Sequence, residues 1–355
     1  MKKINVNAPI NSTGYGIASI NILKYLSSLM ETTLFPIGSP AITTQEEFDL
    51  YNSLTKNMDY CDVDAPVLKI WHQFDLLTKI GHRGQYLAFP FFELDKFSDR
   101  EKTHLKVPDT ILATSEWAKN IVIDNIGECN VKVVPLGVDN KDIFNPEKYN
   151  SEISDKYIFV NIGKWEIRKG HDILLETFKK AFPNNENVEL WVLAPENTNS
   201  YSNQQETLRW KNMYTSDPRV KVFTGFPKHE DVAQFINNAN CGIFLSRAEG
   251  WNLELLECMA MNKPVIATNC SAHTEFCNDN NAFLVRTNGV EKAYDGKAFV
   301  GQGNWAKFDQ NTIDDAIEKM RHVFSNRITT NENGLITANK YSWENTANTI
   351  VGCIE

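Results

Sequence analysis

The chain has 355 residues, 42% of them hydrophobic and 23% charged, so it is long enough for two domains that each bury a core. Its formal net charge of −9 argues against a nucleic-acid backbone as the main partner. The seven cysteines form no C-x-x-C pair, and no apolar run reaches the roughly 18 residues of a membrane span. Neither a disulfide framework, a zinc site nor a transmembrane segment is therefore indicated.

The chain opens with a strand, a glycine-containing loop and a helix. Ile4–Ala8 is a short apolar strand, and Ile17–Met30 has the apolar spacing of a helix. Gly14, Tyr15 and Gly16 lie between them. A third glycine is missing, and so is an acidic residue at the end of the next strand, which argues against dinucleotide binding. The loop either lets a substrate approach the backbone or is a tight turn.

Polar side chains follow the next two predicted strands. The strand Val67–Trp71 is followed by His72, and the strand Tyr86–Phe92 by Glu93. The carboxyl ends of parallel strands point toward the edge where such sheets bind ligands. Both side chains are therefore site candidates, while a packed core histidine remains the alternative for His72.

A cluster of proline, asparagine and charged residues at Pro146–Asp155 separates two predicted strands and marks a domain boundary. After it, the strand Tyr157–Ile162, the loop Gly163–Gly170 and the helix His171–Ala181 repeat the opening pattern. Two such openings predict two similar α/β domains.

Three cations stand in the loop Gly163–Gly170, namely Lys164, Arg168 and Lys169. By themselves they describe a solvated basic turn. Opposite the start of a helix that binds anions, they would instead form a clamp for a diphosphate.

The stretch Cys241–Cys270 predicts a strand, a loop, a helix and a second strand. The loop would bring several backbone N–H groups to the start of the helix, where the helix dipole favours an anion. Glu249 and Glu257 flank this turn. A carboxylate repels a diphosphate but suits the two hydroxyls of a vicinal diol. The pattern predicts a ligand with phosphates and sugar hydroxyls, and the alternative is an ordinary strand–loop–helix with two solvated glutamates.

The sequence EGWNLELLE, from Glu249 to Glu257, resembles the Glu-x7-Glu element of retaining family 4 glycosyltransferases. FPFFELDKF, ATSEWAKNIV and VKVVPLGVDNKDIFNP resemble the end of the N-terminal domain and the linker of the same family. The resemblance implies an α/β protein of the GT-B fold, with two Rossmann-like domains facing each other across a cleft. Its parts would be an acceptor domain (1–150), a nucleotide-sugar domain (151–338) and a C-terminal helix (339–355) that crosses back to the first domain.

The resemblance implies a metal-independent transferase that moves a sugar from a nucleotide diphosphate sugar to an acceptor hydroxyl, with retention and without a cofactor. Lys164, which stands where the family usually has arginine, and Lys169 would stabilise the leaving diphosphate, and Glu249 would hold the sugar. These three are the catalytic candidates. The donor-binding candidates are Glu257 (on the ribose), Gly250, Trp251, Asn252, Leu253, Gly163 and Phe226 (near the base). The acceptor-side candidates are Gly14, Tyr15, Gly16, His72 and Glu93.

The expected partners are a nucleotide sugar donor and a carbohydrate or other hydroxyl acceptor. Polar residues interrupt any signal-peptide core at the start of the chain, so we expect a cytoplasmic protein, and peripheral membrane contact is left open. A nucleotide-sugar epimerase or phosphorylase, or a non-catalytic nucleotide-sugar binding protein, would share the fold. Slow donor hydrolysis would favour a transferase, and interconversion of two sugars an epimerase.

Overall fold

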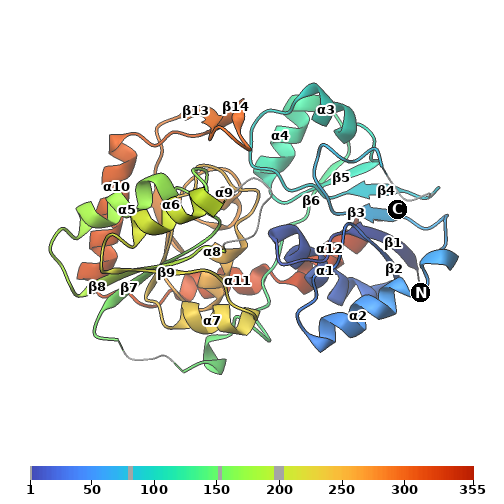
Figure 1. The fold of residues 1–355 in the computed structure, drawn as a ribbon. Coiled ribbons are helices and arrows are strands. Elements are labelled where there is room, and N and C mark those ends of the chain that lie inside the picture. Colours follow the sequence, from blue (N-terminus) through green and yellow to red (C-terminus); the bar gives the residue numbers. More distant parts are fainter. Residues whose placement is uncertain (1, 79–82, 151–153, 196–203) are drawn as a thin grey trace. The chain divides into compact units, whose positions relative to one another are not determined.

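The computed structural model describes residues 2–78, 83–150, 154–195 and 204–355 (Figure 1). The chain divides into two compact units, of which unit 1 comprises Met1–Asp139 with Tyr341–Glu355 and unit 2 comprises Asn140–Lys340. The division falls ahead of the boundary predicted at residue 150. In the described part of the chain, no helix combines the length and the apolarity of a membrane span.

Unit 1 contains a six-stranded sheet with the strand order β2-β1-β3-β4-β5-β6, in which every pairing is parallel. The strands are Lys3–Ala8 (β1), Glu31–Pro36 (β2), Val67–Lys69 (β3), Tyr86–Ala88 (β4), Thr110–Ala113 (β5) and Val131–Val133 (β6). The helices are Gly14–Leu29 (α1), Gln45–Thr55 (α2), Asp99–Leu105 (α3), Glu116–Ile126 (α4) and Trp343–Gly352 (α12).

Unit 2 repeats this architecture with a parallel sheet of order β12-β11-β10-β7-β8-β9 and an antiparallel ribbon, β13-β14. The strands are Tyr157–Ile162 (β7), Val188–Leu193 (β8), Val220–Phe223 (β9), Cys241–Phe244 (β10), Val265–Thr268 (β11), Phe283–Val285 (β12), Val290–Tyr294 (β13) and Val300–Ala306 (β14). The helices are His171–Ala181 (α5), Gln204–Tyr214 (α6), His229–Asn237 (α7), Leu253–Ala260 (α8), His273–Phe276 (α9), Gln310–Ser325 (α10) and Glu332–Lys340 (α11).

The α/β class with parallel sheets, predicted from the sequence, is confirmed in both units. Buried strands explain the continuous apolar runs of the sequence, because helices cover both faces of a parallel sheet. In unit 2, Phe159, Leu190 and Ile243 of three neighbouring strands pack with Leu174 and Phe178 of α5. Figure 1 shows α5 and α6 on one side of the strands β7 to β9 and α7 on the other.

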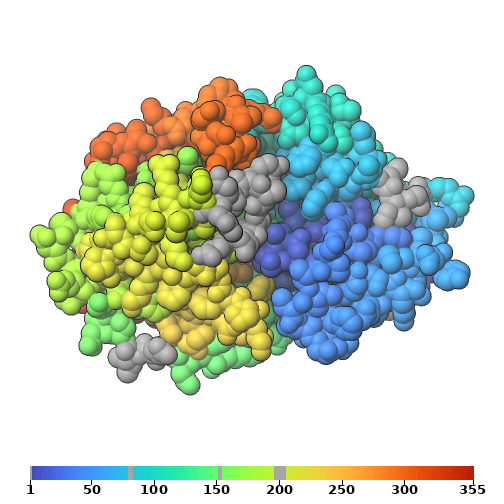
Figure 2. All heavy atoms as spheres, viewed as in Figure 1, coloured from blue at the N-terminus to red at the C-terminus, as the bar shows by residue number. Residues whose placement is uncertain are grey.

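The outer helices are correspondingly polar. Within α2, only Leu54 is buried. Figure 2 shows α2 in blue and α7 in gold on the outer surface of their respective units, on the face drawn there. A helix that covers a sheet needs one apolar stripe and leaves its other face to water.

Several predicted boundaries in unit 1 are wrong. Helix α1 begins at Gly14 and not at Ile17, so Gly14, Tyr15 and Gly16 form its first turn and not a loop before it. The strands β3 and β4 end at Lys69 and Ala88, and His72 and Glu93 therefore lie in the segments that follow and not directly at the strand ends.

The C-terminal helix belongs to unit 1, as predicted. Helix α12 packs against α1, and Val138 donates a backbone hydrogen bond to Tyr341 O at 3.0 Å. Thr346 also donates from Oγ1 to Pro135 O at 2.8 Å. The end of the chain thereby completes the unit in which the chain begins.

Candidate active site

The topology of unit 2 brings two loops together at one edge of its sheet. Strand β7 pairs with β10, as in Phe159 opposite Cys241, and both strands run in the same direction. From β7 the chain moves outward to β8, and it returns later to β10 on the other side of β7. Loops that leave adjacent strands on opposite sides of such a reversal form the usual ligand site of these sheets.

Glycine makes the close contact between these loops possible. Gly170 ends the first loop with φ of +79°, and a Cβ at this position would lie 2.1 Å from Leu245 O. Gly170 is therefore required both by its backbone conformation and by the space that the second loop leaves. Arg247 then ties the loops together, since its guanidinium donates to both carboxylate oxygens of Asp172 at 2.7 Å each.

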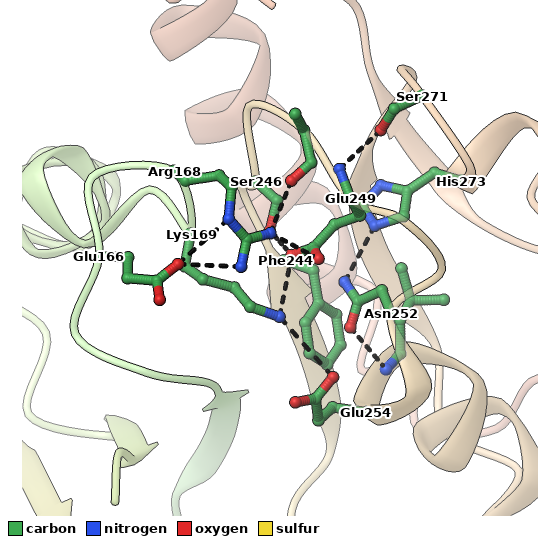
Figure 3. Close-up of polar contacts among 12 residues, drawn as sticks. Glu166, Arg168, Lys169, Phe244, Ser246, Glu249, Asn252, Glu254, Ser271 and His273 are labelled. Carbon is green, nitrogen blue, oxygen red and sulfur yellow. Dashed lines mark hydrogen bonds and ion pairs between the residues drawn. The ribbon is translucent and has the colours of Figure 1, made fainter. Parts of the chain in front are cut away.

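Glu249 lies at the centre of the site and contacts two cations (Figure 3). Lys169 Nζ is 2.9 Å from Glu249 Oε1, and Arg168 Nη1 is 2.8 Å from Oε2. Glu254 Oε2 lies 3.7 Å from Lys169 Nζ, and Glu166 Oε2 lies 2.9 Å from Arg168 Nη2. Glu249, Lys169 and Arg168 are all more than nine-tenths buried. The predicted candidates Glu249 and Lys169 are therefore brought into direct contact.

The charges of this cluster hold one another ionised. Burial alone would raise the pKa of Glu249, but Arg168 and Lys169 outweigh it and hold that pKa well below its usual range. Burial works against the ammonium of Lys169 in the same way, and Glu249 with Glu254 raises the pKa of Lys169. Glu249 is thus a fixed carboxylate at neutral pH.

Two serines fix the position of Glu249. Ser246 Oγ donates to Glu249 Oε1 at 2.8 Å, and the Glu249 backbone N–H donates to Ser271 Oγ at 2.8 Å. With the two cations, these contacts leave the carboxylate little rotational freedom. A charge held in one place without rearrangement is what electrostatic catalysis requires.

The helix α8 begins directly after this carboxylate, at Leu253. Gly250, Trp251 and Asn252 are buried, and the Trp251 ring packs 4.8 Å from that of Phe276. The Asn252 side chain caps the helix by accepting from Leu255 N–H at 3.3 Å. The start of α8 therefore lies at the same edge of the sheet as Lys169, and its use as an anion site remains a prediction.

Glu257 lies one turn into α8 and is buried, with 9% of its surface exposed. Burial and the nearby Glu254 raise the pKa of Glu257 to about 8. At neutral pH this carboxyl is therefore mostly protonated. To accept hydrogen bonds from both hydroxyls of a ribose diol, the Glu257 carboxyl would have to lose that proton.

The other donor-side candidates lie around this edge. Gly163 directly follows β7, and a Cβ there would come within 3.2 Å of Lys169 Cδ, so glycine leaves room for the lysine side chain. Lys164 is half-buried in the same loop. Phe226 follows β9 and packs with Phe223 and Phe235. The roles of these residues toward a donor remain predictions.

The acceptor-side candidates gather at the matching edge of the unit 1 sheet, where β1 and β3 pair. The Tyr15 ring stacks on Phe91 with centroids 4.4 Å apart and meets His72 edge-on at 4.6 Å. Tyr15 Oη also accepts from Phe91 N–H at 2.7 Å. His72 is thus half-buried in an aromatic cluster, and Glu93 lies further along the same segment.

Gly16 has a structural explanation. A Cβ there would lie 2.1 Å from Asn11 O, and Asn11 Oδ1 in turn accepts from Thr13 N–H at 2.9 Å. Glycine is needed because a tight turn packs on the first turn of α1. Gly14 is exposed, and a Cβ there would meet no atom within 4 Å.

Six residues of the site were not among the predicted candidates, namely Glu166, Arg168, Ser246, Glu254, Ser271 and His273. Arg168 was visible as one of three cations in its loop, but the sequence did not show which of them turns toward Glu249. Ser271 and His273 follow β11, which pairs with β10, so their place after a neighbouring parallel strand was the available signal. Among residues 2–78, 83–150, 154–195 and 204–355, no cluster of three or more potential metal-ligating side chains is present.

Parts of the chain are similar in sequence to known glycosyltransferases. Residues 156–296, which contain both site loops, match the family model of glycosyl transferases group 1. The chain is 27% identical over 198 residues to the capsular polysaccharide biosynthesis glycosyltransferase CapM of Staphylococcus aureus, covering 52% of this chain and 50% of that protein. It is 25% identical over 177 residues to an uncharacterised glycosyltransferase of Methanocaldococcus jannaschii, covering 48% and 42%. The chain thus spans about half the length of these relatives.

Solved structures resemble the chain over nearly its whole length. Sucrose-phosphate synthase from Thermosynechococcus elongatus gives a TM-score of 0.70 at 15% identity, covering 99% of this chain and 98% of that one. HepE from Anabaena, in complex with UDP and glucose, gives 0.67 at 15% identity, covering 99% of each chain. The fold is therefore that of GT-B glycosyltransferases.

Proposed function

We propose that the chain is a retaining, metal-independent glycosyltransferase that moves a sugar from a nucleotide diphosphate sugar to a hydroxyl acceptor. The observation that carries the proposal is the buried contact of Glu249 with Lys169 and Arg168 beside the start of α8. The match of residues 156–296 to glycosyl transferases group 1 covers that whole arrangement and supports the same reaction class.

The donor diphosphate lies against the start of α8 and Lys169. Breaking the bond between sugar and phosphate builds negative charge on the diphosphate, which an ammonium and the first-turn N–H groups stabilise. An ammonium has three N–H donors, so Lys169 can keep its ion pair with Glu249 and still donate to a phosphate oxygen. Lys164, in the same loop, adds a second cation for the phosphates.

Glu249 acts on the sugar. Its low pKa keeps it a carboxylate, and its partners hold it in place, so it can accept from a sugar hydroxyl and stabilise positive charge that develops on the ring. Glu249 is not assigned as a nucleophile. The leaving phosphate takes the proton of the acceptor hydroxyl, and the acceptor attacks from the same face, which accounts for retention.

On the nucleotide, Glu257 accepts from the ribose hydroxyls and Phe226 lies near the base. The acceptor is a carbohydrate or another hydroxyl compound that contacts Tyr15, His72 and Glu93 of unit 1.

A thermal-shift panel of nucleoside diphosphates and nucleotide sugars tests the proposal, because a ligand that binds only the folded state raises the melting temperature. We expect one nucleotide series to stabilise the protein in the presence of excess chelator, and the product formed with acceptor to keep the anomeric configuration of the donor in NMR spectra. A panel without any shift would refute the donor site. Activity that chelator abolishes, and that manganese or magnesium restores, would refute metal independence.

A further inference from the structure

The segment Ser271–His273 holds the tetrapeptide Glu249–Asn252 at both of its ends (Figure 3). At the first end, Ser271 Oγ accepts from Glu249 N–H at 2.8 Å, and Ala272 N–H donates to Glu249 O at 3.2 Å. At the second end, Asn252 Nδ2 lies 2.9 Å from His273 Nε2. The residues that would contact donor phosphates are thus fixed by the segment that follows the neighbouring strand β11.

Asn252 has a left-handed backbone conformation at the residue before α8. Its φ is +85°, in the left-handed region, which residues with a Cβ adopt only at an energetic cost. The side chain compensates on both of its polar atoms. Oδ1 accepts from Leu255 N–H at 3.3 Å, and this fixes the amide so that Nδ2 donates to His273.

The imidazole of His273 completes a chain of hydrogen bonds that allows one tautomer. Nδ1 lies 2.8 Å from Thr268 O, a carbonyl that can only accept, so Nδ1 carries the proton. Nε2 is then the acceptor for Asn252 Nδ2. His273 is fully buried, and each bond in the series from Thr268 to Leu255 determines the direction of the next.

We propose that neutral His273 is a positioning residue for sugar transfer: through Asn252 it fixes the left-handed turn that directs the first N–H groups of α8 at the donor diphosphate. The inference rests on the proposed function for its effect on turnover. The structural half, that His273 holds the α8 cap through Asn252, stands on the hydrogen bonds alone.

Protonation of His273 would undo the arrangement. Nε2–H would then face the NH₂ group of Asn252, and a rotated Asn252 amide would lose its bond to Leu255 N–H. The charged groups that act on the imidazole are Glu249, which favours protonation, and Lys169 and Arg168, which oppose it. Burial is the largest influence and lowers the pKa of His273, so the loss of activity is expected below the usual histidine range.

A donor-turnover assay tests this with two substitutions of His273 in the wild type and with one of them repeated in an Asn252→Gly variant. His273→Leu should lower kcat at least about tenfold while the donor KM changes less, since misaligned contacts act mainly in the transition state. His273→Gln, which keeps an acceptor for Asn252 but does not titrate, should retain kcat within about threefold and lose the acidic limb of the pH profile of kcat. Glycine adopts the left-handed turn unaided, so in an Asn252→Gly variant the further substitution His273→Leu should lower kcat by less than about twofold relative to Asn252→Gly alone.

Amide hydrogen exchange at Leu255 separates this inference from the proposed function, because it needs no substrate. We expect Leu255 to exchange at least about tenfold faster in His273→Leu than in the wild type, and His273→Gln to restore protection. Unchanged exchange overturns the inference, and so does an undiminished kcat in His273→Leu or an equal loss in the Asn252→Gly background. If Leu255 exchanges faster in His273→Leu and the wild type turns over no nucleotide sugar, the positioning of the α8 cap by His273 is upheld and the proposed function is overturned.

Discussion

Glu257 should make donor binding depend on pH. Its carboxyl is buried beside Glu254, its pKa is raised to about 8, and Lys169 only partly opposes this shift. A ribose diol donates two hydrogen bonds and is best accepted by the ionised form. Binding therefore requires a carboxylate that is the minor species at neutral pH, and the apparent affinity rises as the pH rises through 8.

The magnitude follows from the ionised fraction. With a pKa of about 8, roughly one carboxyl in eleven is ionised at pH 7 and about nine in ten at pH 9. Since the apparent dissociation constant equals the intrinsic constant divided by the competent fraction, donor affinity should be about tenfold tighter at pH 9 than at pH 7. Binding at pH 7 should release about 0.9 proton, because the bound carboxyl stays ionised.

Calorimetry with a nucleotide sugar measures both quantities, since the phosphodiester groups of the donor do not titrate in this range. Titrations at pH 6 to 9 give the affinity, and two buffers of different ionisation enthalpy give the proton release. Glu257→Gln is the matched control and should bind with a nearly constant, weaker affinity. Affinity that is constant or falls with rising pH in the wild type would refute the reasoning.

Three further substitutions test the cluster around Glu249. Lys169→Ala should lower kcat by roughly 10²–10³ with a smaller change in donor KM, because it removes one preorganised charge. The control is Lys221→Ala, which changes a half-exposed lysine side chain on β9. Near-normal kinetics for Lys169→Ala would mean that the loop is only a solvated basic turn. Glu249→Gln removes the buried carboxylate that Arg168 and Lys169 share and leaves them Glu166 and Glu254 as their charged partners. It should reduce the free energy of unfolding by about 3–5 kcal/mol in denaturant titrations, so a loss below about 1 kcal/mol would contradict the buried contacts. Gly170→Ala combines a positive φ with a carbonyl 2.1 Å from the new Cβ and should cost at least about 2 kcal/mol, and an unchanged melting temperature would argue against this loop packing.

The sequence predicted the parts of the fold whose residues carry a strong local pattern. The strand, loop and helix around Glu249 combine a buried apolar run with a helical stripe, and the structure has β10 and α8 in these places. Helix α3 was missed because DREKTHL is almost wholly polar. A capping box between Ser98 and Glu101 was its readable signal, since the two side chains reciprocally cap the helix start.

The missed site residues depend on tertiary structure. Which of the cations in the loop after β7 turns toward Glu249 is decided by the loop path, and that path depends on Gly170 packing against β10. The raised pKa of Glu257 arises from burial, which no residue pattern reveals. His273 acts on Asn252 across 21 residues of sequence, and only the pairing of β10 with β11 brings them together.

Phosphorus NMR of the purified protein with single nucleotide diphosphate sugars tests the central claim most directly. The account predicts that one donor is converted slowly to its nucleoside diphosphate and free sugar, and faster when a suitable acceptor is added. Lys169→Ala should convert the same donor roughly 10²–10³ times more slowly. Donors that all remain intact with the folded wild type and a range of acceptors, or a donor that is converted into a second nucleotide sugar, would contradict it.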